Sequence, residues 1–576
     1  MRAASGAHKT PPRFDLVFVE EMEWIKAKSA LTPLTTKHSV DLVFGSLPVF
    51  LYKAPLYPDL FEETRMKRIL KAILTFLTGL MIIGLAASSA AAANCESLAS
   101  LKLTNTTITS SNTVAAGAFT PPTTGPPGTA TSQFSNVPAF CRVAATLTPS
   151  SDSDIKVEVW LPVSGWNGKF QAVGNGGFAG VISYSALAAA VTAGYASAST
   201  DTGHQGNTAA FAIGHPEKVI DFADRAVHEM TVQAKSIVNA YYGSAPSLSF
   251  WNGCSQGGRQ GITEAAKYPS DFDGIVAGAS GINWMRLLVA RMAVNVFAHR
   301  GEDSYIPPEK YALVHEAVLK ACDVLDGVKD GVIENPTVCH FDPKVLVCKG
   351  ADGPNCLTPA QAETARSLYA PVKNPKTGAE VMPALLQPGS ELGWAILAGP
   401  EPIRYSTETF QYLVFSDPKW DWHRFNAATD IDLALRTDKG LLEFTDPNLK
   451  PFFDRGGKLL MYHGWADPQV TPMNSVNYFN DVVRKLGAGT GGKSIELYMV
   501  PGMNHCGGGP GTDTFNKMAA IEQWVAGGTA PKQILASHLT NRTVDRTRPL
   551  CPYPQVASYK GGGSTDDAAN FVCKAP

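Results

Sequence analysis

The sequence has little charge and no excess of either sign. Among its 576 residues there are 49 Lys and Arg against 51 Asp and Glu, for a formal net charge of −2. A nucleic-acid-binding domain usually carries a basic patch, so that class is not expected. Charged residues make up 17% of the chain and hydrophobic residues 44%, which excludes wholesale disorder. No internal repeat is apparent.

Cysteine is absent from the first 93 residues, and no Cys-x-x-Cys motif occurs anywhere. The missing motif argues against a redox pair or a zinc–thiolate site. All ten cysteines lie between Cys95 and Cys573. An even number confined to one region is typical of disulfides in an exported protein.

One long apolar run is present, and it lies close to the N-terminus. Basic residues around Met66 precede the stretch Ile69 to Ala86, and small residues follow it up to Ala93. These three parts predict a signal peptide over 66–93, and hence a secreted or periplasmic protein without stable membrane association after cleavage. The alternative is a membrane anchor, because 18 apolar residues reach the lower limit for a span. We interpret residues 1–65 as a misannotated extension upstream of a true start at Met66.

Strand and helix patterns alternate in two parts of the chain, 94–281 and 451–576. Runs such as Lys169 to Val173 and Leu248 to Trp251 are typical of strands, and helical periodicity follows them. This order predicts an α/β fold with a largely parallel sheet covered on both faces. Between the two parts, residues 282–450 lose the alternation, and we interpret them as an inserted lid domain.

A nucleophile elbow is predicted at Gly253-Cys254-Ser255-Gln256-Gly257-Gly258. The motif follows a predicted strand and precedes a predicted helix, and its glycines relieve the crowding of a sharp turn that presents the serine. The alternative is an ordinary glycine-rich turn with a helix-capping serine.

An acid and a base must follow that serine in an α/β-hydrolase fold. Asp467 comes just after the predicted strand Lys458 to Tyr462, and His505 comes just after the predicted strand Ile495 to Val500. Loops at the carboxyl ends of parallel strands converge on the active site, so we expect the two residues to meet Ser255. His463 is a competing base, and a capping aspartate with a surface histidine is the alternative without function.

Cysteines flank two of these three residues. Cys254 directly precedes Ser255, and Cys506 directly follows His505. If the serine and the histidine touch, their neighbours can approach to the Cα separation that a disulfide needs. Nearness in sequence suggests the other pairs: Cys95–Cys141, Cys322–Cys339, Cys348–Cys356 and Cys551–Cys573.

The elbow, the Gly464-x-x-Asp467 loop and Asn504-His505-Cys506 together resemble the tannase and feruloyl esterase family. The resemblance covers nearly all of residues 94–576 and includes Gly174-Asn175-Gly176-Gly177 and the segment 199–204. It implies a secreted serine esterase with a lid, which acts on esters of hydroxycinnamic or gallic acids without an organic cofactor. Terephthalate monoester hydrolases are related, so that activity is an alternative. Lipase, peptidase and acyltransferase activities, and a binding protein on an inactive hydrolase fold, are further alternatives.

A calcium loop is predicted within the lid. Three carboxylates lie close together in a glycine-punctuated segment, and two backbone carbonyls complete the expected ligand set: Asp323, Asp326, Val328, Asp330 and Val332. Oxygen ligands without His or thiolate suit Ca²⁺, and the family resemblance implies calcium here too. The alternative is an acidic surface turn closed by Cys322 and Cys339.

The oxyanion hole needs two backbone N–H donors. The expected donors are the amide of Gln256, just after the nucleophile, and that of Gly177 or its neighbour Gly176 in the early glycine loop. That loop could also be a plain glycine turn. Aromatic residues of the lid could contact a substrate or form the lid's own core: Trp284, Tyr405, Phe410, Tyr412, Phe415, Trp420 and Trp422.

Overall fold

A computed structural model describes residues 93–122 and 132–576 of the chain. The predicted upstream extension lies outside these residues, and so does the predicted signal peptide except for Ala93. Within the described ranges, no helix combines the length and the apolar character that crossing a membrane requires.

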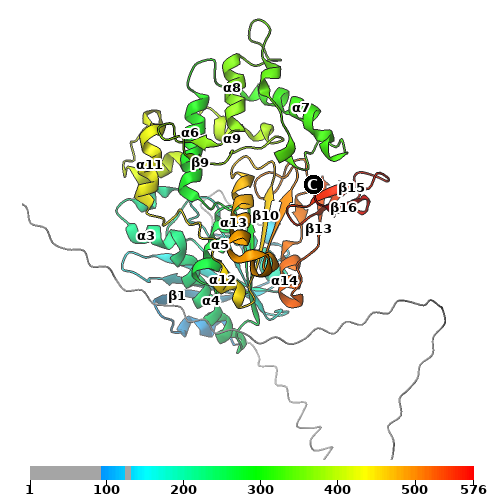
Figure 1. The fold of residues 1–576 in the computed structure, drawn as a ribbon. Helices are drawn as coiled ribbons and strands as arrows, with labels where there is room; N and C mark the ends of the chain where they lie inside the picture. Colours follow the sequence, from blue (N-terminus) through cyan, green and yellow to red (C-terminus); the bar gives the residue numbers. More distant parts are fainter. Residues whose placement is uncertain (1–92, 123–131) are drawn as a thin grey trace, which may run out of the picture. The chain divides into compact units, whose positions relative to one another are not determined.

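A nine-stranded mixed sheet forms the centre of the fold (Figure 1). Strands β1, β2, β3 and β5 pair antiparallel, and every further pair in the order β5-β4-β6-β7-β10-β11 is parallel. Parallel neighbours need crossover connections, which accounts for the helices between these strands. The strands are β1 (Thr106–Val114), β2 (Phe140–Leu147), β3 (Ile155–Pro162), β4 (Lys169–Val173), β5 (Ala196–Thr200), β6 (Leu248–Cys254), β7 (Gly274–Gly278), β10 (Lys458–Gly464) and β11 (Ile495–Val500).

Both faces of this sheet are apolar and covered by helices. Trp251 and Ile275 pack on one face with α4, α5 and α13, whereas Phe250 and Val276 pack on the other with α2 and α14. Strands buried on both faces are typical of parallel sheets, and the arrangement confirms the predicted α/β-hydrolase fold. The helices are α2 (Tyr184–Thr192), α3 (Pro216–Ile220), α4 (Ala226–Tyr242), α5 (Gln256–Lys267), α12 (Lys450–Asp454), α13 (Pro472–Thr490) and α14 (Lys517–Gly527).

Residues 282–450 contribute no strand to the nine-stranded sheet. They form helices that gather together in Figure 1, and a short hairpin, β8 with β9. Apolar clusters join this segment to the sheet domain; in one of them, Trp284 and Met285 pack with Phe178 and Phe222. The elements are α6 (Trp284–Ala298), α7 (Tyr311–Cys322), α8 (Pro359–Leu368), β8 (Val372–Lys373), β9 (Glu380–Met382), α9 (Ala395–Ala398), α10 (Arg404–Glu408) and α11 (Ala427–Asp438).

The C-terminal residues form two small antiparallel sheets. One contains β12 (Thr514–Phe515), β13 (Ile534–Thr540) and β14 (Thr543–Leu550), and the other contains β15 (Val556–Tyr559) and β16 (Phe571–Lys574). Phe571 and Ala557 pack with Val328 of the inserted segment 282–450, the predicted lid. The C-terminus therefore lies against the segment predicted to bind calcium.

Candidate active site

Ser255 occupies a sharp turn between β6 and α5. Its backbone has φ 64° and ψ −122°, a conformation that residues with a side chain rarely adopt. A Cβ on Gly253 would lie 2.4 Å from the carbonyl oxygen of Gly257. Only glycine fits at that position, and the strained turn presents the serine hydroxyl at the carboxyl end of the sheet, as in a nucleophile elbow.

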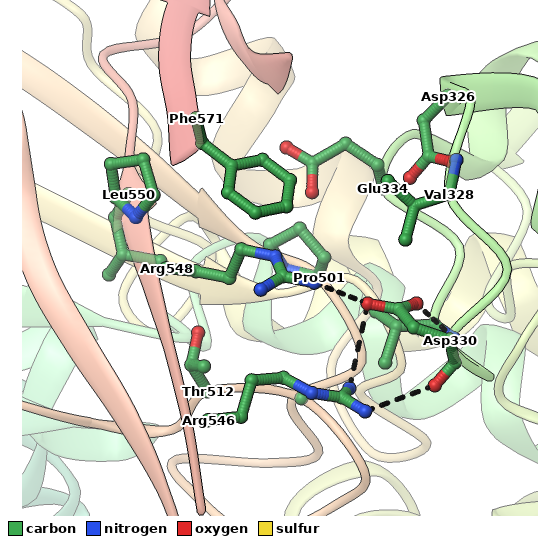
Figure 2. A pocket seen from close by; sticks show the side chains of 13 residues that line it. Asp326, Val328, Asp330, Glu334, Pro501, Thr512, Arg546, Arg548, Leu550 and Phe571 are labelled. Atoms are coloured by element: carbon green, nitrogen blue, oxygen red, sulfur yellow. Dashed lines mark hydrogen bonds and ion pairs between the residues drawn. The ribbon is translucent and has the colours of Figure 1, made fainter. Parts of the chain in front are cut away.

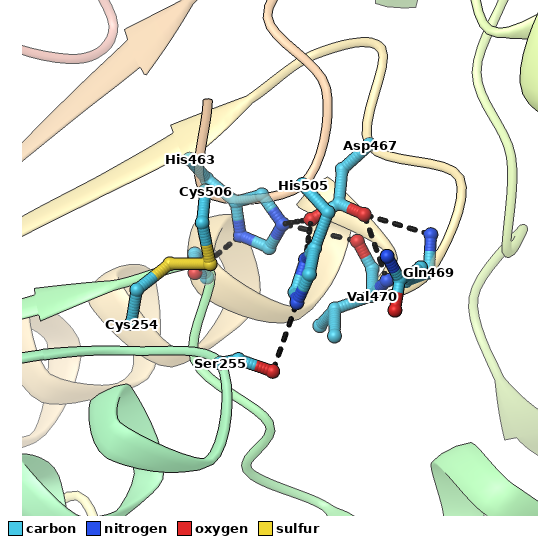
Figure 3. Close-up of a disulfide and its surroundings, with 9 residues drawn as sticks. Cys254, Ser255, His463, Asp467, Gln469, Val470, His505 and Cys506 are labelled. Atoms are coloured by element: carbon cyan, nitrogen blue, oxygen red, sulfur yellow. Dashed lines mark hydrogen bonds and ion pairs between the residues drawn. A yellow bond between two sulfur atoms is a disulfide. The ribbon is translucent and has the colours of Figure 1, made fainter. Parts of the chain in front are cut away.

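Ser255, His505 and Asp467 form one hydrogen-bonded chain (Figure 3). Nε2 of His505 lies 2.8 Å from Oγ of Ser255, and Nδ1 lies 2.7 Å from Oδ2 of Asp467. The acid follows β10 and the histidine follows β11, at the positions expected from the sequence. Such a chain can remove the serine proton and stabilise the resulting imidazolium.

Asp467 is fully buried and fully hydrogen-bonded. Oδ1 accepts the backbone N–H groups of Gln469 and Val470 at 2.7 and 3.0 Å. Oδ2 lies within hydrogen-bonding distance of two histidines, His505 at 2.7 Å and His463 at 3.1 Å. Burial alone would raise the pKa of this carboxyl, but the charge of His505 and the hydrogen bonds from both histidines hold it below the ordinary value. Asp467 therefore stays ionised.

His463 lies beneath the acid rather than beside the serine. It has no exposed surface, and its Nδ1 lies 2.8 Å from Oγ of Ser475 in α13. Its other nitrogen, Nε2, faces Asp467 and the carbonyl oxygen of Val470. The hydrogen bond to Ser255 belongs to His505, so the geometry favours His505 over His463 as the base.

A disulfide connects the two loops that carry the serine and the histidine (Figure 3). Cys254 and Cys506 are 252 residues apart in sequence, and their Cα atoms lie 6.0 Å apart. The other eight cysteines form the four pairs predicted from the sequence, and no cysteine is free. The predicted disulfide pattern is confirmed.

The early glycine loop follows β4 and lies against the elbow. The N–H of Gly257 donates to the carbonyl oxygen of Asn175 at 2.8 Å. Within the described residues, the N–H groups of Gln256, Gly176 and Gly177 donate to no protein group. These free donors are what an oxyanion hole requires, and the geometry leaves both glycines as candidates for the second donor.

Comparisons with known proteins agree with this geometry. The model of the family described as "Tannase and feruloyl esterase" matches residues 141–574. The chain belongs to the tannase and feruloyl esterase family. It is 35% identical to an uncharacterized esterase of Xanthomonas campestris, over 88% of this chain and 95% of that protein. It is 34% identical to a probable feruloyl esterase B-2 of Aspergillus terreus, over 75% of this chain and 86% of that protein.

Solved structures of the same family share the fold. Feruloyl esterase B from Aspergillus oryzae superimposes with a TM-score of 0.78 at 32% identity, covering 83% of this chain and 99% of that one. Tannin acyl hydrolase from Aspergillus niger superimposes with a TM-score of 0.70 at 23% identity, covering 85% and 94%. The protein is therefore a carboxylic ester hydrolase with an α/β-hydrolase fold.

Two of the seven lid aromatics lie next to the glycine loop of this esterase. The ring of Tyr405 is 5.8 Å from that of Phe178, and its hydroxyl occupies the space that a Cβ on Gly177 would need. The Trp284 ring is 5.6 Å from Phe178. Of the others, Phe410 and Phe415 both stack on Trp420, while Trp422 stacks on His423 and Tyr412 lines a separate cavity.

Asn207 ties Tyr405 to the glycine loop and could not be identified from the sequence. Its Oδ1 accepts the N–H of Phe178 at 2.8 Å, and its Nδ2 donates to the Tyr405 hydroxyl at 3.0 Å. The residue lies in an unremarkable stretch of sequence, and Tyr405 is 198 positions away. The lid therefore has a direct polar contact with the loop that holds the free N–H groups.

The predicted calcium loop borders a small cavity between the lid and the C-terminal strands (Figure 2). Asp323 accepts the N–H groups of Asp330 and Gly331, and Asp326 accepts that of Val328 at 2.9 Å. Oδ2 of Asp330 lies 2.5 Å from Arg548 and 3.7 Å from Arg546. In this described part of the chain, the carboxylate oxygens of Asp323, Asp326 and Asp330 do not form a cluster in which all three lie within 4.8 Å of one another.

The loop nevertheless suits a hard cation by its donors and its charge. Burial, together with the charges of Asp330 and Asp323, raises the pKa of Asp326 to about 6. No hydrogen bond within the described ranges uses the carbonyl oxygens of Val328 or Val332. Free carbonyls beside uncompensated carboxylates are the ligands that Ca²⁺ prefers.

Proposed function

We propose that the protein is a secreted serine esterase that hydrolyses esters of hydroxycinnamic or gallic acids through an acyl-enzyme. The observation that carries this proposal is the hydrogen-bonded chain Ser255–His505–Asp467, fixed by the Cys254–Cys506 disulfide, in a member of the tannase and feruloyl esterase family. The names of the relatives, feruloyl esterase and tannin acyl hydrolase, support an aromatic acyl group.

The acylation step begins at Ser255. His505 accepts the hydroxyl proton at Nε2 while Oγ attacks the ester carbonyl carbon, and Asp467 stabilises the imidazolium through Nδ1. The carbonyl oxygen gains negative charge, and the N–H groups of Gln256 and Gly177 would stabilise it by donating hydrogen bonds to that oxygen. The C–O bond to the alcohol then breaks, and His505 returns the proton to the departing oxygen.

Deacylation repeats these steps with water. His505 removes a proton from a water molecule, the hydroxide attacks the acyl carbon, and the bond to Ser255 breaks as Oγ regains a proton. The aromatic acid leaves and the free serine is restored. No step requires an organic cofactor.

Calcium would have a structural role in this proposal. Carboxylates of Asp323, Asp326 and Asp330 and carbonyl oxygens of Val328 and Val332 would hold the ion. It would neutralise the crowded carboxylates and fasten the lid against the C-terminal strands, where Phe571 packs on Val328.

Export is supported by chemistry as well as by the apolar leader. Five disulfides in one chain persist in an oxidising compartment and are rare in the cytosol. Detection of the mature protein outside the cytoplasm, with the residues up to and including Ala93 removed, would support secretion. A cytoplasmic protein with reduced thiols would contradict it.

A substrate panel tests the proposed activity. Purified enzyme is assayed on methyl ferulate, methyl gallate, chlorogenate, a terephthalate monoester and a p-nitrophenyl alkanoate, with the Ser255→Ala variant as the blank. We expect the highest kcat/KM on a ferulate or gallate ester. A preference for the terephthalate monoester or for the alkanoate would replace the proposed substrate class and leave the serine mechanism in place.

A further inference from the structure

Asp467 shares one carboxylate oxygen between two histidines, only one of which can reach the serine. Oδ2 lies 2.7 Å from His505 and 3.1 Å from His463. The mechanism uses His505 and leaves His463 without a role. A fully buried, ionisable side chain in contact with the catalytic acid needs an explanation, because burying a polar group is costly unless it is hydrogen-bonded.

The surroundings of His463 determine which nitrogen carries its proton. Nε2 faces two acceptors, Oδ2 of Asp467 and the carbonyl oxygen of Val470 at 3.0 Å. It must therefore be protonated. Nδ1 faces the Ser475 hydroxyl at 2.8 Å, which can donate to it. A neutral ring with hydrogen on Nε2 thus satisfies every partner.

We propose that His463 is a positioning residue of the esterase. Its Nε2–H donates a hydrogen bond that holds Oδ2 of Asp467 in place. The same hydrogen bond partly neutralises the charge on Oδ2 and so weakens the stabilisation that this oxygen gives to protonated His505. The proposal rests on the serine mechanism given above. Two backbone N–H groups hold Oδ1, so His463 supplies the fourth hydrogen bond and leaves Oδ2 one direction in which to meet His505.

The titratable and charged groups around Asp467 determine the direction of the expected effect. They come from three elements: His463 on β10, His505 after β11 and Arg291 on α6, whose charge interacts with Asp467. Without the hydrogen bond from His463, the Asp467 carboxylate would attract protonated His505 more strongly. The protonated form of the base would gain stability, so activity would begin to fall at a higher pH.

The test is the pH dependence of kcat/KM for p-nitrophenyl acetate. In His463→Phe with Ser475→Ala, the donor is removed and no buried hydroxyl is left unpaired. We expect kcat/KM to fall by about ten- to a hundredfold, because Asp467 is no longer held in one orientation. We also expect the midpoint of the acidic limb to rise by about one pH unit, because the free energy of a hydrogen bond to a charged group corresponds to a pKa shift of roughly one unit. Ser475→Ala, which keeps the Nε2 donor, should leave the midpoint unchanged.

A role in packing alone would lower the melting temperature without moving this midpoint. A folded double variant with the wild-type midpoint would therefore overturn the proposal. His463→Gln retains an amide N–H near the position of Nε2 and should restore the wild-type midpoint, whereas a shift as large as that of the Phe variant would contradict it. Because the assay uses an activated acetate, the wrong aromatic substrate class would leave this test intact.

A measurement on the unmodified active site covers the case in which the double variant does not fold. ¹⁵N NMR of histidine-labelled enzyme at neutral pH should show one buried ring protonated only at Nε2, with its signal missing in His463→Gln. The opposite tautomer, with hydrogen on Nδ1, would remove the donor to Asp467 and overturn the proposal.

Discussion

The catalytic centre and the predicted calcium loop shift the pKa values of their buried carboxyl groups in opposite directions. Asp467 accepts four hydrogen bonds, and its pKa lies below the ordinary value. Asp326 is partly buried beside two other carboxylates, and its pKa is raised to about 6. Near it, burial raises the pKa of Glu334 to about 8.

This difference indicates what each region needs from outside the chain. In the catalytic centre, the acid, the base and the disulfide that joins the two loops all come from the protein. The loop carries negative charge that the two arginines compensate only at Asp330. We therefore expect variants to damage chemistry at the first region and stability at the second.

Removing the nucleophile should have the largest effect on chemistry. Ser255→Ala should lower kcat by about a thousandfold or more, because the catalytic chain acts as a unit. His505→Ala should be nearly as damaging, and the melting temperature should stay close to that of the wild type. Hydrolysis of the best panel substrate measures kcat, and His423→Ala, at an exposed lid histidine, is the matched control. More than a few per cent residual activity in Ser255→Ala would reject the assignment.

Breaking the covalent link should affect both chemistry and stability. The Cys254–Cys506 bond closes a loop of 252 residues, so the chain-entropy model gives about 5.5 kcal/mol of stabilisation. We expect Cys254→Ser with Cys506→Ser to lose roughly a hundredfold in kcat/KM at temperatures where the fold survives, because His505 is no longer held at Ser255.

The lid disulfide is the matched control for that variant. Cys348 and Cys356 are only 8 residues apart, so the same model gives about 2.5 kcal/mol. Cys348→Ser with Cys356→Ser should keep most of the activity. Equal losses of kcat/KM in the two double variants would show that the link has no special role in catalysis.

Removing calcium should affect stability first. An ion that binds only the folded state, at a thousand times its dissociation constant, contributes about 4 kcal/mol. Chelation should therefore lower the melting temperature by several degrees, and Asp326→Asn with Asp330→Asn should abolish that response. Calorimetry with and without chelator measures the shift. If purified protein contains no calcium and chelator leaves the melting curve unchanged, the loop is an acidic turn.

Asp201 is a further buried carboxylate, and replacing it should change stability only modestly. Burial raises its pKa to about 7, although its carboxylate accepts N–H groups of Gly203 and Lys156 at 2.9 Å. A folded-state pKa above the ordinary 3.8 means that ionisation costs stability, so stability falls as the pH rises from about 4 through 7. Asp201→Asn cannot ionise, and its advantage in melting temperature should grow by a few degrees over this range. Parallel curves for the two proteins would contradict this.

Much of the catalytic centre could be predicted because it follows from chain order. Ser255, Asp467 and His505 each lie within a few residues of the carboxyl end of a parallel strand, and such loops meet at one edge of a sheet. The flanking cysteines then had one plausible partner each. All of these residues lie close to recognisable strands, where sequence patterns are most informative.

The supporting contacts could not be predicted in this way. His463 is the last residue but one of β10, and by its place in the sequence it is a candidate base. Its Nε2 contacts Asp467 and Val470 because the chain turns back between these two residues, and the sequence does not reveal that turn. The contact of Asn207 with Tyr405, and that of Arg548 with Asp330, depend on how the lid and the C-terminal strands pack. No local pattern in the sequence records contacts of that range.

Labelling with a fluorophosphonate, which reacts with activated serines, tests whether Ser255 is the nucleophile that attacks aromatic esters. We expect one phosphonyl group per molecule, located on Ser255 by peptide mapping, with loss of activity in proportion to labelling. Excess methyl ferulate should slow the reaction, and Ser255→Ala should stay unlabelled. Stoichiometric labelling of a different residue, or full esterase activity in enzyme labelled at Ser255, would show that Ser255 is not the nucleophile.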